Sequence, residues 1–153
     1  MKESFRQLFI LYGALAGGQI LFAAVVMALI SQSPETGTDQ DNIFMTILPF
    51  FVLSCIFAAF GINRMRKSKA AEVAPEGRFD YYRSLLIIRC ALVEGASLFS
   101  IVVALITSDM RYLLFFAACL IAFMVLRPGV DEYLRLFSFS PQEEAKIRQE
   151  LSN

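Results

Sequence analysis

A single glutamate, Glu94, lies near the middle of a long, mostly apolar run over residues 85–106. A helix rises about 1.5 Å per residue, so the tenth residue of this run would lie about 15 Å along it, near the midplane of a membrane about 30 Å thick. A charged residue there costs about 2.5–3.5 kcal/mol on insertion scales, and such residues usually face a bundle interior or serve a function. We therefore expect Glu94 to be neutral at rest unless a cation or water reaches it.

Gln19 is the natural partner for this carboxyl, because it is the middle residue of the apolar run over residues 8–30 and so has nearly the same depth. Its amide can both donate to and accept from a protonated carboxyl. Cys90 and Ser97 share the helix face of Glu94 and give that face a small, mildly polar character. The sequence thus predicts an intramembrane polar site of Glu94, Gln19, Ser97 and Cys90.

Arg89 is five residues from Glu94, a poor spacing for a helical ion pair, and is expected to extend toward the membrane interface.

Glycines accompany both polar residues, at Gly13, Gly17 and Gly18 before Gln19 and at Gly95 after Glu94. Small residues four apart let transmembrane helices approach closely. We expect these glycines to bring the first span against the third, so that Gln19 reaches Glu94 in a structural hydrogen-bonded contact. Two other interpretations remain open: Glu94 is a titrating proton site, or it contacts another subunit.

Residues 91–105 resemble the carboxylate-bearing helix of the proteolipid (c) subunits of rotary ATPases, where small residues, an aromatic and a Val/Leu run follow the carboxylate. The resemblance implies a glutamate that binds a proton or sodium ion. The resemblance is confined to these fifteen residues. The rest of the chain departs from that family, since the carboxylate lies in the third span and the charged middle loop and C-terminal segment are foreign to it.

Enzymatic chemistry has little support in this sequence. The chain has no histidine, which removes imidazole bases and the commonest metal and haem ligands. It shows no nucleophile elbow, phosphate-binding loop or pair of intramembrane carboxylates. Three cysteines, Cys55, Cys90 and Cys119, all fall within apolar runs and suggest no disulfide framework. We expect no enzyme activity, no metal and no cofactor.

The elements that position Glu94 are four apolar runs. The composition is 57 % hydrophobic and the mean hydropathy is +0.58. A membrane-crossing helix needs about 20 apolar residues, which predicts spans at about residues 8–30, 43–62, 85–106 and 110–127. The fourth is short, so its flanking arginines must extend to the interface. The predicted fold is an all-α, integral membrane four-helix bundle made of two hairpins.

The two hairpins could be a tandem repeat. Residues 14–29 and 91–106, aligned with a shift of 77, are identical at seven of sixteen positions. Chance similarity between apolar segments is the competing explanation.

The net charge is zero, but the basic residues are unevenly distributed. They precede the first run, fill the connection between the second and third, and follow the fourth: Lys2, Arg6, Arg64, Arg66, Lys67, Lys69, Arg78, Arg83, Arg127, Arg135, Lys146 and Arg148. The positive-inside rule then predicts an integral protein of the cytoplasmic or plasma membrane with both termini in the cytoplasm. The basic loop fits this topological role. Binding to anionic lipid headgroups is the functional alternative, and we expect no nucleic-acid partner.

Residues 128–153 form a predicted cytoplasmic segment after the transmembrane domain of residues 1–127. Pro128 and Gly129 should end the fourth helix. The aromatic stretch that follows is expected to lie on the membrane or fold back under the bundle. Ser140, Pro141 and Glu143 have the spacing of a capping box, which predicts a helix over about 141–151.

The favoured function is a non-catalytic membrane protein that acts as an accessory or assembly partner, with the C-terminal segment, its aromatics exposed, as contact surface for a protein partner. The alternative is a small proton- or ion-coupled carrier or channel in which Glu94 titrates. Membrane lipid is an implied partner in both, and a homo-oligomer remains open.

Overall fold

The computed structural model describes residues 2–32, 41–137 and 139–152, and it is helical apart from short turns in these ranges. The prediction of an all-α fold is confirmed. Six α-helices and two short 3-10 turns occur in the described ranges, in the order α1 Lys2–Ile30, α2 Asp41–Ala70, η1 Pro75–Gly77, α3 Arg78–Thr107, η2 Met110–Tyr112, α4 Leu113–Val125, α5 Val130–Phe137 and α6 Pro141–Ser152.

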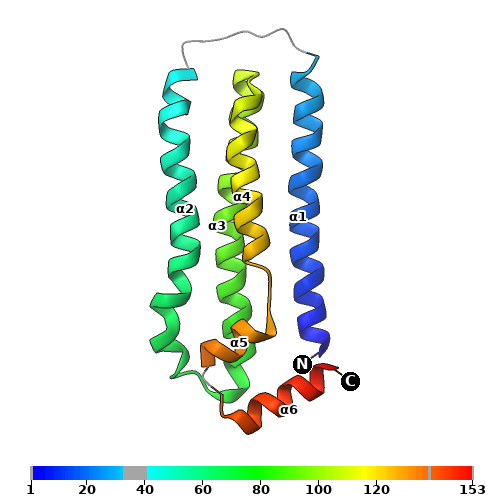
Figure 1. The fold of residues 1–153 in the computed structure, drawn as a ribbon, viewed down its shortest axis with the longest axis vertical. Coiled ribbons are helices and arrows are strands. Elements are labelled where there is room, and N and C mark those ends of the chain that lie inside the picture. Colours follow the sequence, from blue (N-terminus) through cyan, green and yellow to red (C-terminus); the bar gives the residue numbers. More distant parts are fainter. Residues whose placement is uncertain (1, 33–40, 138, 153) are drawn as a thin grey trace.

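The first four helices run side by side along the long axis of the molecule (Figure 1). The central helix is α3, which contacts α1, α2 and α4. Helices α1 and α2 lie on either side of the α3–α4 pair, and α1 runs parallel to α3. Helices α5 and α6 lie across the end of the molecule that holds the N-terminus.

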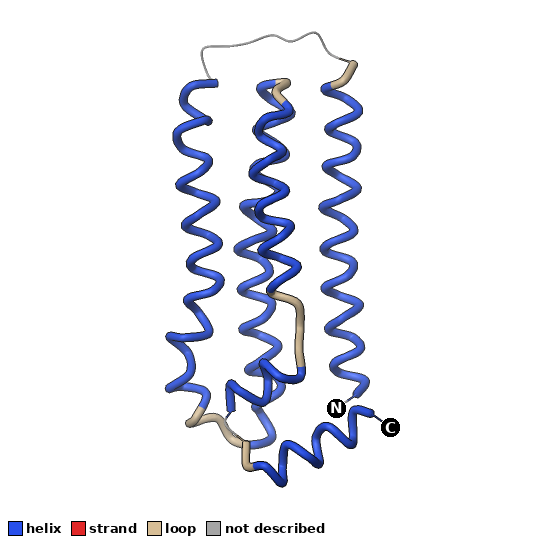
Figure 2. Tube along the Cα trace, viewed as in Figure 1, coloured by secondary structure: helices blue, strands red, loops and turns tan. Residues whose placement is uncertain are grey.

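Three helices are long and apolar enough to cross a membrane, over Glu3–Ile30, Ile43–Arg66 and Pro75–Thr107. A fourth is reached only if Met110–Val125 and Val130–Phe137 count as one broken span, and these two segments are bent by 67°. Helix α4 ends at Val125, just before Pro128, which lacks the N–H that a continuing helix would need. The loop after α4 carries the chain to α5 (Figure 2).

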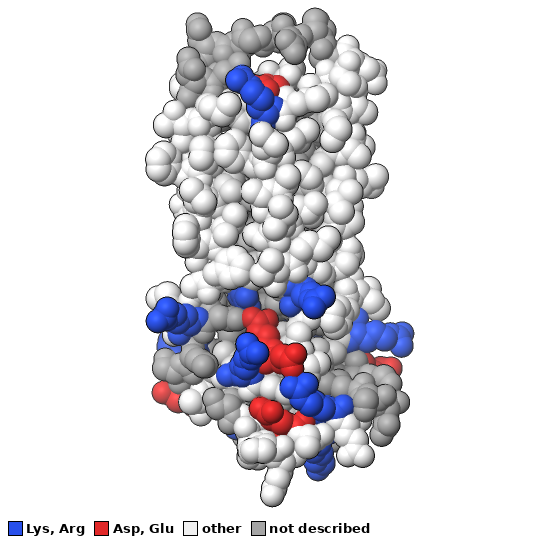
Figure 3. Space-filling view, in the orientation of Figure 1, with Lys and Arg blue, Asp and Glu red and all other residues white. Residues whose placement is uncertain are grey.

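The long helices differ in how much of their apolar surface this chain covers. Half of the most apolar stretch of α3 is buried, compared with 22 % for α1 and 17 % for α2. The face in Figure 3 has an uncharged band over the middle of the molecule, with most charged side chains at the end that holds α5 and α6. The outer helices therefore present apolar side chains to their surroundings.

The connection between α3 and α4 is a tight turn, as expected from its length. Ser108 closes α3 in the left-handed conformation, with φ 53°, a common helix C-terminus. The Asp109 carboxylate then accepts hydrogen bonds from the side chain and backbone N–H of Arg111 at 2.6 and 2.8 Å. These bonds hold the pKa of Asp109 below its usual range.

The expected packing of the glycines is corrected by the structure. A Cβ placed on Gly13, Gly17, Gly18 or Gly95 would meet no atom of the described chain within 4 Å beyond its own surroundings in the helix. Helix α1 instead turns inward a stripe of mostly larger residues, spaced three and four apart: Phe5, Leu8, Gln19, Ala23, Val26 and Ile30, with Tyr12 and Leu15 half-buried. Burying these larger side chains removes more apolar surface, so the glycines face outward.

Candidate functional site

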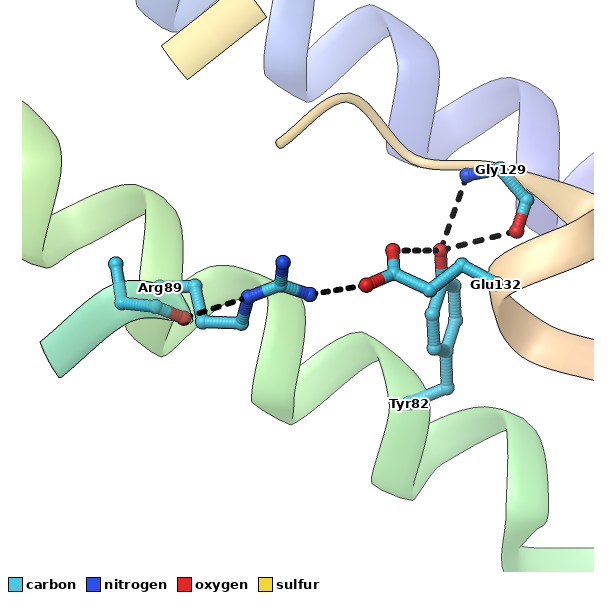
Figure 4. Close-up of polar contacts among 5 residues, drawn as sticks. Tyr82, Arg89, Gly129 and Glu132 are labelled. Atoms are coloured by element: carbon cyan, nitrogen blue, oxygen red, sulfur yellow. Dashed lines mark hydrogen bonds and ion pairs between the residues drawn. The ribbon is translucent and has the colours of Figure 1, made fainter. Parts of the chain in front are cut away.

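The most connected polar cluster lies at the cytoplasm-facing end predicted from sequence, around Arg89 of α3. Arg89 is 5 % exposed, and its Nη1 forms a 2.5 Å ion pair with Oε1 of Glu132 in α5. Its Nε donates to the backbone carbonyl of Ala59 in α2 at 3.0 Å. Figure 4 shows the guanidinium between these two acceptors. Arg89 thus points into the protein rather than toward a membrane interface, because a carboxylate and a carbonyl converge on it there.

Tyr82 completes this cluster from the first turns of α3. Its hydroxyl lies 3.3 Å from Oε2 of Glu132 and 3.2 Å from the Gly129 carbonyl, either of which it can donate to. It accepts from the Gly129 N–H at 3.1 Å (Figure 4). Each of the two Glu132 oxygens therefore has a partner. The cluster of Arg89, Glu132, Tyr82, Gly129 and Ala59, hereafter the Arg89 network, joins α2, α3 and α5.

Aromatic rings hold the other side of α5. Tyr133 meets Phe5 of α1 at 5.9 Å, Tyr82 of α3 at 5.5 Å and Phe137 at 5.3 Å between ring centroids, all edge-on. Edge-to-face pairs contribute about 0.5–1.5 kcal/mol beyond the area that they bury. Tyr133 and Phe137 are buried, which corrects the expectation of exposed aromatics in this segment. The apolar face of α5 packs under α1–α3. Of the two alternatives expected from the sequence, the segment therefore folds back under the bundle.

Helix α6 begins with the capping box expected from sequence. The Ser140 N–H donates to Oε2 of Glu143 at 3.0 Å, and the Glu143 N–H donates to the Ser140 hydroxyl at 3.4 Å. Arg148 then pairs with Asp131 of α5 at 2.7 Å, and Ile147 is buried. Helix α6 is therefore docked on the rest of the chain, and its outward face is polar.

The second polar cluster joins α1 to α3 at the depth predicted for Gln19. The Ser97 hydroxyl donates to Oε1 of Gln19 at 2.7 Å, and both residues are almost completely buried. The other end of the amide, Nε2, is buried without a hydrogen-bond partner in the described part of the chain. The predicted hydrogen-bonded contact between Gln19 and Glu94 is not formed, and Ser97, one turn along α3, takes the role expected of Glu94.

Glu94 lies at the margin between the buried and outward faces of α3. Cys90, Val93 and Ser97 on one side of it are buried, whereas Ala91 and Gly95 on the other are exposed. Glu94 itself is half-buried, and within the described residues it has no hydrogen bond or ion pair, although the Cys90 thiol is within electrostatic range. This marginal position explains why the inward-facing Ser97 reaches Gln19 and Glu94 does not.

Of the four predicted polar residues, Gln19 and Ser97 meet at the α1–α3 contact, Cys90 lines the same side of α3, and Glu94 stays at the margin. The four predicted packing glycines do not contribute to this contact. Sequence reasoning missed the Arg89 network. The available signal was a second charge, Arg89, in the same apolar run as Glu94, together with an acidic residue in the amphipathic segment after Pro128. No group of three or more His, Cys, Asp or Glu side chains able to hold a metal occurs among the described residues.

Comparison with protein-family models, with curated proteins and with solved structures finds no match. The resemblance of residues 91–105 to rotary-ATPase proteolipids stays a prediction, and the function has to be inferred from the chemistry of the two polar clusters.

Proposed function

We propose that the protein is an integral membrane protein whose α1–α4 form a four-helix transmembrane bundle with both termini in the cytoplasm. The support is the set of three or four long apolar helices, the uncharged band over the middle of the face shown in Figure 3 and the one-sided distribution of Lys and Arg. Reporter fusions after residue 38 and after residue 73 test this topology. Cytoplasmic activity of the fusion after residue 38 would contradict it.

We propose further that the protein is not an enzyme but an accessory or assembly partner of another membrane protein. The observation that carries this proposal is Glu94. It is a half-buried carboxyl on the outward margin of an apolar helix, without a hydrogen bond or ion pair in the described chain. A carboxyl in hydrocarbon is costly unless it is paired or wet. A neighbouring protein that supplies its partner removes this cost.

The outward face of α6 is the second surface available to a partner, since the aromatics of α5 are already engaged. Affinity purification from native membranes should recover a stoichiometric partner. Deleting residues 141–153 should weaken that recovery while the protein itself remains in the membrane. Recovery of the protein alone, from both the full-length and the shortened form, would count against an accessory role.

A proton- or ion-coupled carrier is the second candidate. It is favoured by the buried, unsatisfied Nε2 of Gln19 and by a titratable group, Glu94, at the same predicted depth. The Glu94→Gln variant separates the two functions, because it keeps a hydrogen-bonding group of similar size and removes titration. A carrier loses pH-dependent flux in proteoliposomes with this change. An accessory protein shows no such flux with either residue.

A further inference from the structure

A groove runs between α1 and α3 on the face of the molecule where Glu94 emerges. Leu8, Leu11 and Leu15 line it from α1, and Leu86, Ile87 and Cys90 line it from α3. These six side chains are apolar or weakly polar. Tyr12 also lines the groove, and its hydroxyl already donates to the carbonyl of Phe123 in α4. The groove therefore offers no partner for a charged group along this stretch.

Helical spacing places Glu94 where the groove continues away from the N-terminal end of α1. Ile87, Cys90 and Glu94 are three and four residues apart and therefore share one face of α3. Leu11, Leu15 and Gly18 share one face of α1 in the same way. Gly18 and Glu94 do not line the groove, but because the two helices run in parallel (Figure 1), the line of the groove leads on toward the faces that carry them.

The space beside the carboxyl is open at this level. A Cβ on Gly18 or on Gly95 would meet nothing within 4 Å, and Ala91, one turn below Gly95, is exposed. Small residues at a membrane helix surface permit the close approach of a further helix. Glu94 thus lies on α3 one turn beyond the groove-lining Cys90, with small residues and open space at neighbouring positions of its helix.

Charge and depth decide what can fill this site. A phospholipid does not match this site. Its charged headgroup lies at the interface and only its apolar tails reach the midplane, where the carboxyl of Glu94 is expected. A second copy of the chain lacks a complementary charge at the midplane. Arg89 is the one basic residue in the first three predicted spans, and it is already paired with Glu132. The bases of the fourth, Arg111 and Arg127, lie at its two ends. The remaining occupant is a helix of a different protein that carries a base at the midplane.

We propose that the α1–α3 groove binds a transmembrane helix of another protein through an ion pair between Glu94 and a Lys or Arg of that helix. Apolar side chains of the bound helix fill the groove between Leu11 and Ile87, and its backbone approaches over Gly18 and Gly95. This inference rests on the proposed accessory function and gives the chemistry of the partner. Pairing with a base removes the cost of the lone carboxyl.

The test uses the full-length protein in phosphatidylcholine vesicles and a synthetic Leu–Ala transmembrane peptide of about 21 residues, long enough to span the bilayer. One peptide has Lys at its centre, a second has Leu there, and a third has the Lys moved two turns toward one end. Association is measured by energy transfer from a donor on the protein N-terminus to an acceptor on the peptide.

The central-Lys peptide should bind about tenfold more tightly than the other two, a difference of about 1.4 kcal/mol. Glu94→Gln should remove this preference, since the amide keeps the shape but not the charge. Gly95→Leu should weaken binding of all three peptides by filling the open space. Gly61→Leu is the matched control, because a Cβ on Gly61 of α2 also meets nothing within 4 Å, and it should leave binding unchanged.

Equal binding of the three peptides overturns the proposal, as does a Lys preference that survives Glu94→Gln. Self-association of the protein through this face, which the peptide fails to displace, also overturns it in favour of a second copy. The accessory function is judged separately, by affinity purification of the unchanged protein and of the Glu94→Gln variant from native membranes. Equal recovery of a native partner with both proteins would leave the accessory function standing and would overturn Glu94 as its contact.

Discussion

Two charged residues of α3, Arg89 and Glu94, are only five positions apart and have opposite surroundings. Arg89 is buried and bonded on two sides, to the carboxylate of Glu132 and to the carbonyl of Ala59. Glu94 is half-buried and has no hydrogen bond or ion pair among the described residues. Five residues correspond to more than one helical turn, so the two side chains leave α3 in different directions.

The difference distinguishes two kinds of charged residue. A structural charge has its hydrogen bonds and ion pairs within the chain, and an available charge lacks them and can bind a further molecule. The cost of removing Arg89 from water is offset within the chain, because its carboxylate partner is in turn bonded to Tyr82. Nothing in the described chain offsets the cost of Glu94 in the same way. A charge whose bonds are complete stabilises one arrangement of helices, whereas a charge without them is where a further molecule or a proton is expected to act.

The largest effect should come from breaking the Arg89 network. Arg89→Leu leaves Glu132, whose side chain is 27 % exposed, without its cation. Removal of one member of a fully buried ion pair costs about 3–5 kcal/mol, so this loss should lie at the lower end, about 3 kcal/mol. The free energy of unfolding, measured by denaturant titration in detergent, should fall by this amount. Arg83→Leu changes an exposed arginine of the same helix and should have an effect below about 0.5 kcal/mol.

The double variant Arg89→Leu with Glu132→Leu sharpens this prediction. Replacing both members of a buried pair by apolar residues is often neutral or stabilising, so the double variant should regain most of the stability lost in the single one. Additive losses would mean that the two side chains do not act as a pair.

Tyr82→Phe should have the next largest effect. It removes the hydroxyl that bonds Glu132 and Gly129 and leaves the ring in the aromatic cluster. A buried group left without its hydrogen bond costs about 1–3 kcal/mol. Tyr81→Phe is the matched control, since the Tyr81 hydroxyl makes a single exposed bond at 3.4 Å. Equal thermal stability of the two variants would show that the Tyr82 hydroxyl bonds are energetically unimportant.

Much of the fold could be predicted from the sequence, because long apolar runs and their polar breaks are local signals. The inward direction of Gln19 could also be predicted from its depth in the apolar run, but its hydrogen-bond partner is Ser97 and not the predicted Glu94. The glycine motif failed because spacing alone does not say which face of a helix turns inward. On α1 the stripe of larger residues competes with the glycines and buries more apolar surface.

The Arg89 network could not be predicted, because it depends on a contact across 43 positions between α3 and α5. From the sequence alone, the long and flexible side chain of Arg89 is expected to reach the membrane interface. Its inward direction is caused by a tertiary contact. The amphipathic α5 folds back after Pro128, its Tyr133 packs against Phe5 and Tyr82, and this brings Glu132 to the guanidinium.

Glu94→Leu should change stability much less than Arg89→Leu. No bond within the described chain is lost, so the free energy of unfolding of the isolated protein should shift by less than about 1 kcal/mol, in either direction. Gly17→Leu, an outward substitution into open space, provides the comparison. A loss of more than about 3 kcal/mol for Glu94→Leu, the range of a broken buried pair, would show that the carboxyl has a partner within the chain, and the contrast with Arg89 would disappear.

The smallest effect concerns the hydrogen bond of the Gln19 amide. Its measurement distinguishes the observed partner, Ser97, from the expected partner, Glu94. Hydrogen bonds between membrane helices average about 0.6 kcal/mol with a maximum near 1.7. A double-mutant cycle of Gln19→Leu with Ser97→Ala should give a coupling in this range, because the two side chains share a 2.7 Å bond. The cycle of Gln19→Leu with Glu94→Gln should give a coupling near zero. Both cycles are measured side by side by unfolding in detergent. A coupling to Glu94 as large as the coupling to Ser97 would mean that the Glu94 carboxyl also bonds the unsatisfied Nε2 of Gln19. Glu94 would then be a structural charge, like Arg89.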